Sequence, residues 1–426
     1  MKLICVDLDT ALPAIPPCTH GAQWVLARLH GRPVGVVYPP AAGCDPAELG
    51  RLILAQRGWA IAQHLAADCL ADAPAFADLS SLPRACPRAP ATPALTLTVA
   101  VCTRNRAAQL SECLDALAAI DYPPPLLDIV IVDNAPSDGS TRDVVARYPR
   151  MRYIVEPRPG LDWARNAAIR ASTADIVAYT DDDVSVDRGW PKAIAAAFEA
   201  EPHAACVTGL VVPDELDSPA QVLFETYGGF GRGFERAVYR VDVERGESAA
   251  RLYGGTGRFG TGANMAFRRS FFASEGLFDP ALDVGTPTNG GGDLEMFFRV
   301  LKAGRTLVYE PAAMVRHRHR RSYGELRTQI ANNGIGFYSY LVRTAQAYPD
   351  ERAALARLGL WWLWWWNVRR IVRALVRPGP VPLDLMLAEL KGSFIGLRRY
   401  AVARRHAAAV LQQFGPPSER AAAEIS

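Results

Sequence analysis

The chain has 426 residues, half of them hydrophobic, which is enough to bury at least one large core and to form two or three domains. Its 47 basic and 44 acidic residues leave a net charge of +3, so the composition excludes a disordered tail and a general nucleic-acid binder. The eight cysteines form no C-x-x-C pair and no spacing typical of a zinc site or a disulfide scaffold, which favours a reducing cytoplasm.

Residues 1–82 are predicted to form a small separate module. The segment Trp24 to Tyr38 favours two strands around a His30-Gly31 turn, and a helical stretch follows at Leu52 to Leu70. Residues 83–96 contain four prolines, which is typical of a linker between folded units.

The first nine residues are not typical of a signal peptide, because Asp7 and Asp9 interrupt their apolar run. Secretion is therefore not expected. The same Asp7-Leu8-Asp9-Thr10 segment also resembles the aspartyl-phosphate motif of HAD-type phosphatases. No partner motif follows within the module, so a phosphatase is kept only as an alternative function.

From Leu97 the chain alternates short apolar runs with amphipathic segments, which predicts a doubly wound, mostly parallel α/β sheet flanked by helices. In such sheets ligands bind at the carboxyl ends of the strands, so the polar residues that end each run are candidate site residues. The strand-like runs are Leu97–Cys102, Asp128–Val132, Tyr153–Val155 and Ile176–Thr180.

Three adjacent carboxylates, Asp181, Asp182 and Asp183, directly follow the last of these runs. They repel one another unless a cation or hydrogen-bond donors lie among them. Hard oxygen ligands of this kind suit Mg²⁺ or Mn²⁺. An acidic turn exposed to solvent, or a helix N-cap, is the alternative interpretation.

Seven segments between about Leu97 and Tyr340 resemble, in order, the motifs of family 2 glycosyltransferases of the GT-A fold. A lone D-x-D motif is common, whereas seven motifs in order are specific. The resemblance implies a catalytic domain at 97–345 that moves a sugar from a nucleotide-diphosphate sugar to a hydroxyl with inversion. The segments are CTRNR, VDNAPSDGS, GLDWARNAAI, YTDDDV, GTGANMAFRR, GGGDLEMFFRVLKAG and VYEPAAMVRHRH.

The resemblance also implies which residues bind the donor nucleotide. Thr103 and Asp133 would hold the base, with Arg104 beside them, and UDP is expected because a carboxylate accepts well from the uracil ring N–H. Arg165 would pair with the diphosphate, since a guanidinium binds phosphate bidentately. A helix cap at Asp133 and a surface arginine at Arg165 are the alternatives.

Further implied residues surround the metal and the donor sugar. Asp181 and Asp183 correspond to the D-x-D motif, so they would contact the ribose and hold the metal ion that bridges the diphosphate. His317 would be an additional metal ligand, although an ordinary surface histidine is the alternative. In the strand-like VRHRH segment, His317 and His319 are expected to face the same side.

Two glycine-rich segments are expected to lie at the sugar and the acceptor. Asn264 belongs, with Gly262 and Ala263, to the implied donor-sugar and acceptor loop. A G-x-G-x-x-G match at 255–260 does not open a βαβ unit, so it is interpreted as a flexible loop over the acceptor rather than a dinucleotide site.

Asp293 is the expected general base. It occupies the position of the base in the family, just ahead of an apolar helix at Leu294–Leu301, and the glycines at 290–292 let the backbone approach substrate closely. The glutamate that often precedes the base is replaced by Gly292, so Glu295 is an alternative base. A carboxylate attracted to the helix N-terminus would also explain Asp293.

Residues 346–426 are predicted to form a basic helical tail, since twelve Lys or Arg and six Asp or Glu follow from Asp350 onward. The segment lacks the roughly 20 apolar residues needed to span a bilayer. Peripheral membrane contact through 355–377 is one expectation, and packing on the catalytic domain or a second subunit is the other. The expected apolar face comprises Trp361, Trp364, Trp365, Val368, Ile371, Val372 and Leu375, and the basic face Arg369, Arg370, Arg373 and Arg377.

Together these features predict a metal-dependent glycosyltransferase that uses Mn²⁺ or Mg²⁺, a nucleotide-sugar donor and a saccharide or lipid-linked acceptor. We expect it in the cytoplasm or peripherally at the inner face of the cytoplasmic membrane, in cell-envelope or exopolysaccharide synthesis, without a nucleic-acid partner. A non-catalytic sugar-nucleotide-binding scaffold is the alternative, because the base motif is altered. A nucleotidyltransferase fits the fold but not the order of the motifs.

Overall fold

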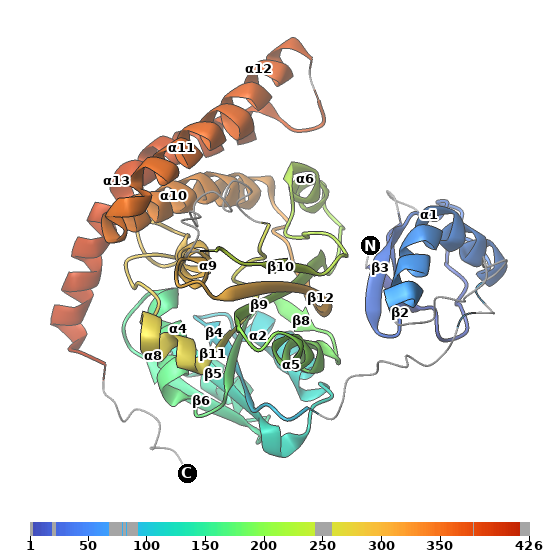
Figure 1. Ribbon diagram of the computed structural model, residues 1–426, viewed down its shortest axis with the longest axis horizontal. Helices are drawn as coiled ribbons and strands as arrows, with labels where there is room; N and C mark the ends of the chain where they lie inside the picture. Colours follow the sequence, from blue (N-terminus) through green and yellow to red (C-terminus); the bar gives the residue numbers. More distant parts are fainter. Residues whose placement is uncertain are drawn as a thin grey trace.

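The computed structural model describes residues 3–18, 23–67, 79, 82, 93–242, 258–377 and 379–417. These residues form a small N-terminal sheet, a large central sheet with helices on both faces, and a C-terminal group of long helices (Figure 1). The predicted α/β class with a helical C-terminal region is therefore confirmed. Most of the proline-rich 83–96 segment lies outside the described residues.

The N-terminal sheet contains β1 (Ile4–Asp7), β2 (Val25–Leu29) and β3 (Arg32–Val37), with α1 (Pro46–Ala67) packed on one face. His30 and Gly31 have φ angles of 52° and 73°, as the tight turn between β2 and β3 requires. The other face of the sheet packs on the central sheet. The apolar side chains in this contact are Leu3, Leu26, Val36, Leu210, Val212 and Met314.

Asp7 and Asp9 are both used in structural contacts. Arg28 pairs with Asp7 at 2.8 Å and with Asp187 of the central domain at 2.5 Å, so it also joins the two parts of the molecule. Asp9 accepts a hydrogen bond from the backbone N–H of His30 at 3.0 Å. Neither carboxylate is left as an unpaired nucleophile, which argues against the phosphatase alternative.

The central sheet has the strand order β10-β12-β9-β11-β7-β4-β5-β6, and β8 also pairs with β12. The run β7-β4-β5-β6 is parallel, whereas β8, β10 and β11 pair antiparallel with their neighbours, so the sheet is mixed. Its strands are β4 (Leu97–Thr103), β5 (Leu127–Asn134), β6 (Met151–Glu156), β7 (Ile176–Asp181), β8 (Val184–Val186), β9 (Ala204–Pro213), β10 (Ala237–Tyr239), β11 (Asn264–Arg268) and β12 (Thr306–His317).

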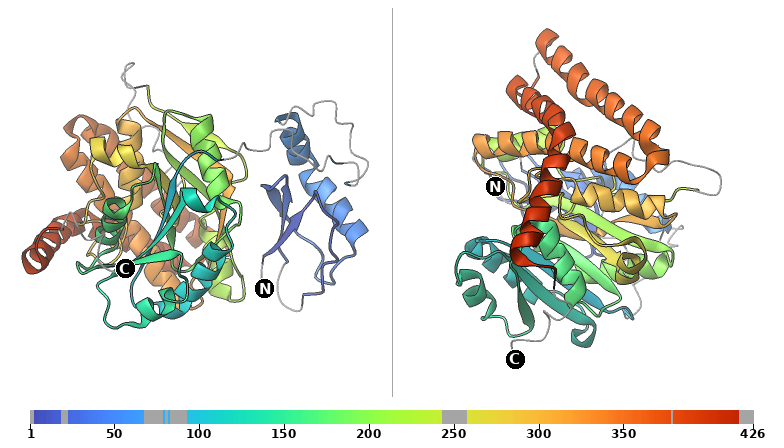
Figure 2. Two further views of the ribbon diagram at one scale, coloured as in Figure 1. Left: turned by 90° about the horizontal axis from the view of Figure 1, so that it is seen from below. Right: turned by 90° about the vertical axis from the view of Figure 1, so that its left-hand side faces the viewer.

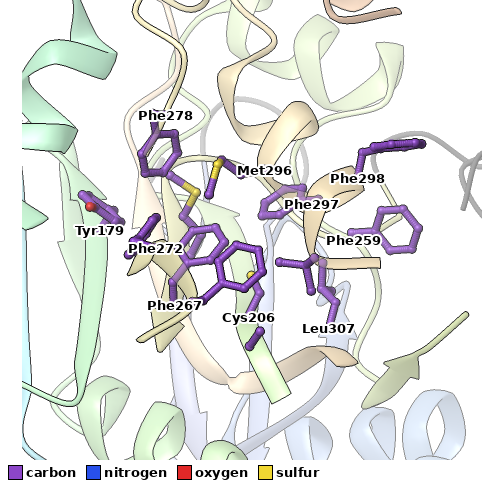
Figure 3. Close-up of a cluster of buried hydrophobic side chains, with 14 of the residues drawn as sticks. Tyr179, Cys206, Phe259, Phe267, Phe272, Phe278, Met296, Phe297, Phe298 and Leu307 are labelled. Carbon is purple, nitrogen blue, oxygen red and sulfur yellow. The ribbon is translucent and has the colours of Figure 1, made fainter. Parts of the chain in front are cut away.

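Alternate residues of the central strands enter two separate cores, because successive side chains of a strand point to opposite faces. In β5, Val130 and Val132 join one core, and Ile129 and Ile131 join the other. The first core is rich in aromatic side chains (Figure 3) and is covered by α4, α8, α9 and α10, while α2 and α5 cover the second. Burial on both faces explains why the strands are almost continuously apolar.

Most of the helices that follow the central strands are short. Those that pack around the sheet are α2 (Ala107–Ala118), α3 (Ser140–Val145), α4 (Leu161–Ala171), α5 (Trp190–Ala200), α6 (Pro219–Tyr227), α8 (Arg269–Glu275) and α9 (Gly292–Lys302).

The C-terminal helices pack on one another, and α10 and α11 also pack on the aromatic-rich core at one face of the central sheet. A capping box between Ser322 and Glu325 begins α10. Gly392 and Gly334 let α10 and α13 approach backbone to backbone: a Cβ at Gly392 would lie 2.1 Å from the Ala331 carbonyl oxygen. The helices are α10 (Tyr323–Ala347), α11 (Arg352–Trp362), a π-helical segment (Leu363–Val368), α12 (Arg369–Val376) and α13 (Leu383–Phe414).

The α11–α12 rod, residues 352–376, extends beyond the α/β body (Figures 1 and 2). Within the described residues, no helix is both long enough and apolar enough to cross a membrane.

Candidate active site

The polar clusters that end the parallel strands meet at one edge of the sheet. Thr103 lies opposite Asp133 in the pairing of β4 with β5, and Cys102 lies opposite Asp181 in the pairing of β4 with β7. Because carboxyl ends of parallel strands align, residues far apart in sequence converge here.

Asp181, Asp183 and His317 form a group that is suited to a metal ion. Each offers one ligand atom, and these atoms all lie within 4.8 Å of one another. The local fold explains the convergence: β8 follows the acidic turn at once and pairs with the end of β12, opposite His317. His317 Nε2 lies 3.4 Å from Asp183 Oδ1.

The electrostatics of this group fit a divalent cation. Burial, followed by the charge of Asp183, raises the pKa of Asp181, which is the response expected of crowded carboxylates. Burial also lowers the pKa of His317 to about 4, so its imidazole is neutral and able to bind a metal. Two carboxylates and one imidazole suit Mn²⁺ or Mg²⁺.

Neighbouring side chains hold the acidic turn in place. The Thr103 hydroxyl donates to Asp182 at 2.7 Å, and Arg106 donates to Asp182 at 2.5 Å and to Asp183 at 3.3 Å. Thr103 therefore supports the acidic turn in this structure, and Arg106 is a site residue that was not predicted.

His317 is oriented by a further pair of residues. His319 Nδ1 lies 3.1 Å from His317 Nδ1, and His319 Nε2 lies 2.7 Å from Glu225 Oε1. The two histidines thus face the same side, as expected from their spacing. Such partners fix the orientation of a metal-binding imidazole.

The remaining residues predicted to bind the nucleotide differ in exposure. Asp133 is fully buried and accepts a hydrogen bond from the Tyr153 hydroxyl at 2.8 Å, so contact with a base requires movement of its neighbours. Arg104 is exposed at the end of β4, next to Asn105, whose φ of 53° turns the chain.

A cavity of about 630 Å³ opens beside Asp181, Asp183 and His317, which we call the metal-binding group, and Asp181 is part of its lining. Its polar part contains Arg165, Arg232 and Asp293. Its other part is an aromatic wall made largely by the C-terminal region. The members of this wall are Phe224, Tyr227, Phe230, Phe337, Trp361, Trp362, Trp365 and Trp366.

Asp293 lines the cavity, whereas Glu295 faces the core. Asp293 lies in the first turn of α9, and its Oδ2 accepts the backbone N–H of Gly262 at 2.8 Å. Burial and the nearby charge of Asp283 raise the pKa of Asp293. Glu295 is fully buried and paired with Arg299 and Arg343, which gives it a structural role and leaves Asp293 as the carboxylate that can meet a substrate.

Arg165 lies among the carboxylates of the cavity. Its Nη1 donates to Asp162 at 2.9 Å and to Asp283 at 2.5 Å, and the side chain is buried. Arg165 also lines the cavity together with Asp181, and its contact with a diphosphate stays a prediction. Its charge opposes the upward pKa shifts of Asp181 and Asp293.

Asn264 makes structural contacts within the domain. It was expected to contact the donor sugar, but its amide group donates to the carbonyl oxygens of Leu210 and Ala313 at 3.1 and 2.8 Å. Its Oδ1 accepts from the Trp190 indole at 2.9 Å. Both amide hydrogens are used, so Asn264 links β9, β12 and α5. Residues 255–257 of the G-x-G-x-x-G match lie outside the described residues, while Arg258 and Gly260 line the cavity.

An acidic metal-binding edge on a doubly wound sheet, with an enclosed carboxylate in the adjoining cavity, is typical of transferases that act on nucleotide-activated donors. Residues 98–275 match the family model "Glycosyl transferase family 2". The resemblance to family 2 glycosyltransferases noted in the motifs of the chain is therefore confirmed over this segment. The matched segment ends before Asp293 and His317.

Curated relatives show the same likeness. The chain is 28% identical over 275 residues to a pre-mycofactocin glycosyltransferase of Mycobacterium tuberculosis, covering 64% of this chain and 53% of that relative. It thus spans about half the length of that relative. A glucosyl-dolichyl phosphate glucuronosyltransferase of Haloferax volcanii is 26% identical over 247 residues, covering 53% of this chain and 69% of the relative.

A similar solved structure is the mannosyltransferase PcManGT from Pyrobaculum calidifontis in complex with GDP-Man and Mn²⁺. It is 19% identical, with a TM-score of 0.44, and the match covers 78% of this chain and 92% of that one.

Proposed function

We propose that this chain is a metal-dependent, inverting glycosyltransferase that uses a UDP-sugar and a saccharide or lipid-linked hydroxyl acceptor in cell-envelope or exopolysaccharide synthesis. One observation carries the proposal: Asp181, a member of the metal-binding group, and Asp293, a carboxylate of raised pKa, line the same cavity. A donor bound at the first would therefore present its sugar toward the second.

The reaction is a single displacement at the anomeric carbon. Asp293 takes the proton of the acceptor hydroxyl while that oxygen bonds to the anomeric carbon and the bond from this carbon to the phosphate oxygen breaks. The nucleoside diphosphate leaves with the bonding electrons, and attack from the opposite face inverts the configuration. A divalent ion held by Asp181, Asp183 and His317 would neutralise the leaving diphosphate.

Asp293 is suited to this role by its surroundings. A carboxylate of raised pKa is a stronger base than an ordinary aspartate. The backbone N–H of Gly262 fixes its direction, and a side chain at Gly262 would collide with Arg165, since its Cβ would lie 2.7 Å from Nη2. The glycine therefore keeps the arginine and the base close together.

We propose that the acceptor reaches the cavity from a membrane surface that the α11–α12 rod contacts. Trp361 and Trp365 line the cavity and are also 42% and 46% exposed, so the aromatic wall continues onto the outside of the rod. Trp364 and Leu375, further along the rod, are 61% and 65% exposed. Basic side chains beside them, including Arg369 and Arg373, complement anionic lipid headgroups.

The decisive experiment compares donor binding and sugar transfer in Asp293→Asn. The purified chain is screened by thermal shift with Mn²⁺ and a panel of nucleoside diphosphates, and transfer from the matching sugar nucleotide to a membrane-lipid extract is then measured. We expect binding within about twofold of wild type and turnover lower by at least about 100-fold. Chelation with EDTA should abolish both signals.

The exposed Asp121→Asn variant is the control and should transfer normally. Unchanged turnover in Asp293→Asn would exclude Asp293 as the base. Nucleotide binding without any turnover in the wild-type chain would favour the scaffold alternative.

A further inference from the structure

Arg232 is a cation in the catalytic cavity that has no carboxylate partner among the described residues, and we propose that it binds a phosphate group there. The inference rests on the proposed function and adds a residue to the same site. The shared chemistry is a phosphate oxygen, supplied either by the diphosphate of the donor or by a phosphate that links the acceptor to its lipid.

The contacts of Arg232 leave most of its hydrogen-bonding capacity unused. Its Nη1 donates only to the backbone carbonyl oxygens of Gly229 and Gly231, at 3.2 and 2.9 Å. Its Nε is buried without a hydrogen-bond partner. Among the described residues, no Asp or Glu oxygen lies within 4.0 Å of its guanidinium, because Arg232 takes part in none of the ion pairs.

Arg232 is half-buried, and the fully buried arginines of the domain are neutralised at close range. Arg158 pairs with Glu156 at 2.7 Å, Arg165 with Asp162 and Asp283, and Arg299 with Glu295. Arg232 differs from them although it lies in the same domain. An uncompensated charge removed from water is costly unless a ligand of opposite charge binds beside it.

The electrostatic environment of Arg232 agrees with this interpretation. Burial lowers its pKa, while the charges of Glu225 and Asp293 oppose the shift only from a distance. Glu225 is already hydrogen-bonded to His319. A guanidinium matches a phosphate in charge and in bidentate geometry, and it would gain both in exchange for its backbone contacts.

The loop that carries Arg232 lies next to the metal-binding group. Phe230 packs on His317 with ring centroids 5.0 Å apart, and it also contacts the ring of His319. Gly228, Gly229 and Gly233 have positive φ angles, which shape the turn on either side of Arg232. A phosphate held at the metal-binding group would therefore lie close to this loop, which favours the donor diphosphate as the source.

The test measures binding of two phosphate probes to the full chain by calorimetry. Inorganic pyrophosphate with Mn²⁺ represents the donor diphosphate, and dodecyl phosphate represents a lipid-linked acceptor. We compare wild type with Arg232→Gln, and with Arg236→Gln as a control, because Arg236 has Glu201 and Glu310 as partners outside the cavity. Loss of one charged, bidentate contact in Arg232→Gln should lower the affinity for the probe that Arg232 binds by about tenfold. The affinity of the control variant should stay within about twofold of wild type.

The possible results distinguish the donor from the acceptor as the source of the phosphate, and they distinguish failure of this inference from failure of the proposed function. Loss confined to pyrophosphate assigns Arg232 to the donor, and loss confined to dodecyl phosphate assigns it to the acceptor. Arg232→Gln should also unfold at the same temperature as wild type or higher, since it removes an unpaired charge. Equal binding of both probes by Arg232→Gln and wild type would overturn the inference alone. A wild-type chain that binds neither probe would overturn the proposed function with it.

Discussion

Asp293 and Glu295 lie two residues apart in the first turn of α9, yet their environments differ completely. Asp293 reaches the cavity and keeps only backbone hydrogen bonds, from Gly262 and Leu294, at 2.8 Å each. Glu295 is locked into the core by Arg299 and Arg343. Residues at this spacing on a helix point in different directions, and packing decides which one meets substrate.

The raised pKa of Asp293 predicts the acid limb of the pH profile. Only the ionised carboxylate can accept a proton, so kcat/KM should fall as the pH drops through that pKa, above the range of an ordinary aspartate. Asp283→Asn removes a like charge and should move this acid limb of the profile to lower pH. Position 283 has a φ of 71°, which asparagine tolerates. An unmoved limb would show that Asp283 does not tune the base.

Much of this site could not be predicted from local sequence. The strand ends and the acidic triplet were visible, because an apolar run followed by polar residues is a local pattern. The pairing of Arg165 with Asp283 joins residues 118 positions apart, and the three bonds of Asn264 join β11 to β9, β12 and α5. Such contacts depend on the tertiary fold, so the motifs alone gave no sign of them.

At the scale of secondary structure, glycine contacts connect α13, α10 and the loop that precedes α9. Gly336 of α10 abuts Gly290, and a Cβ there would lie 2.8 Å from the Gly290 carbonyl carbon. Gly392 of α13 fits equally closely against α10 on the Ala331 carbonyl. The position of α13 therefore helps to fix the loop that leads into Asp293.

Gly392→Ala should destabilise the fold and lower activity together. The added methyl group would overlap the Ala331 carbonyl, and overpacking of this kind costs about 1–3 kcal/mol. Gly324→Ala is the matched control, because it lies in the first turn of α10 and its Cβ would meet nothing within 4 Å. Thermal unfolding and turnover are measured for both variants. A Gly392→Ala chain that is as stable and active as the control would contradict the close packing.

The parallel strands were predicted from the sequence more accurately than the segments that connect and follow them. The four predicted strand cores lie within β4, β5, β6 and β7, since alternating apolar runs and helices form a strong pattern. The antiparallel strand β11 was not predicted, and its first residue, Asn264, was placed with Gly262 and Ala263 in a substrate loop on the strength of the motif. In the tail, the predicted face is largely exposed, but Trp362 and Trp366 pack inward.

At the scale of the whole molecule, the exposed apolar residues of the α11–α12 rod predict membrane binding. Wild-type protein should float with vesicles that contain phosphatidylglycerol, and less with pure phosphatidylcholine or at high salt. The double variant Trp364→Glu and Leu375→Glu should bind such vesicles about tenfold more weakly, because it places charge on the inserted face.

Trp59→Glu is the control for this experiment. Trp59 is 77% exposed on α1, far from the rod in sequence, and its substitution should leave flotation unchanged. Equal flotation of the double variant and wild type would leave the exposed tryptophans as a surface for protein contacts only.

The cavity draws its two halves from different parts of the chain. The acidic turn comes from the segment that matches the family, whereas half of the aromatic wall, its four tryptophans, comes from residues 361–366 beyond that segment. Recombination within such a gene could exchange these tryptophans and retain the acidic turn. The resulting enzymes would use the same sugar donor and transfer the sugar to different acceptors. Sequence divergence among these enzymes would then be greatest after residue 275, in the part of the chain that the family model does not cover.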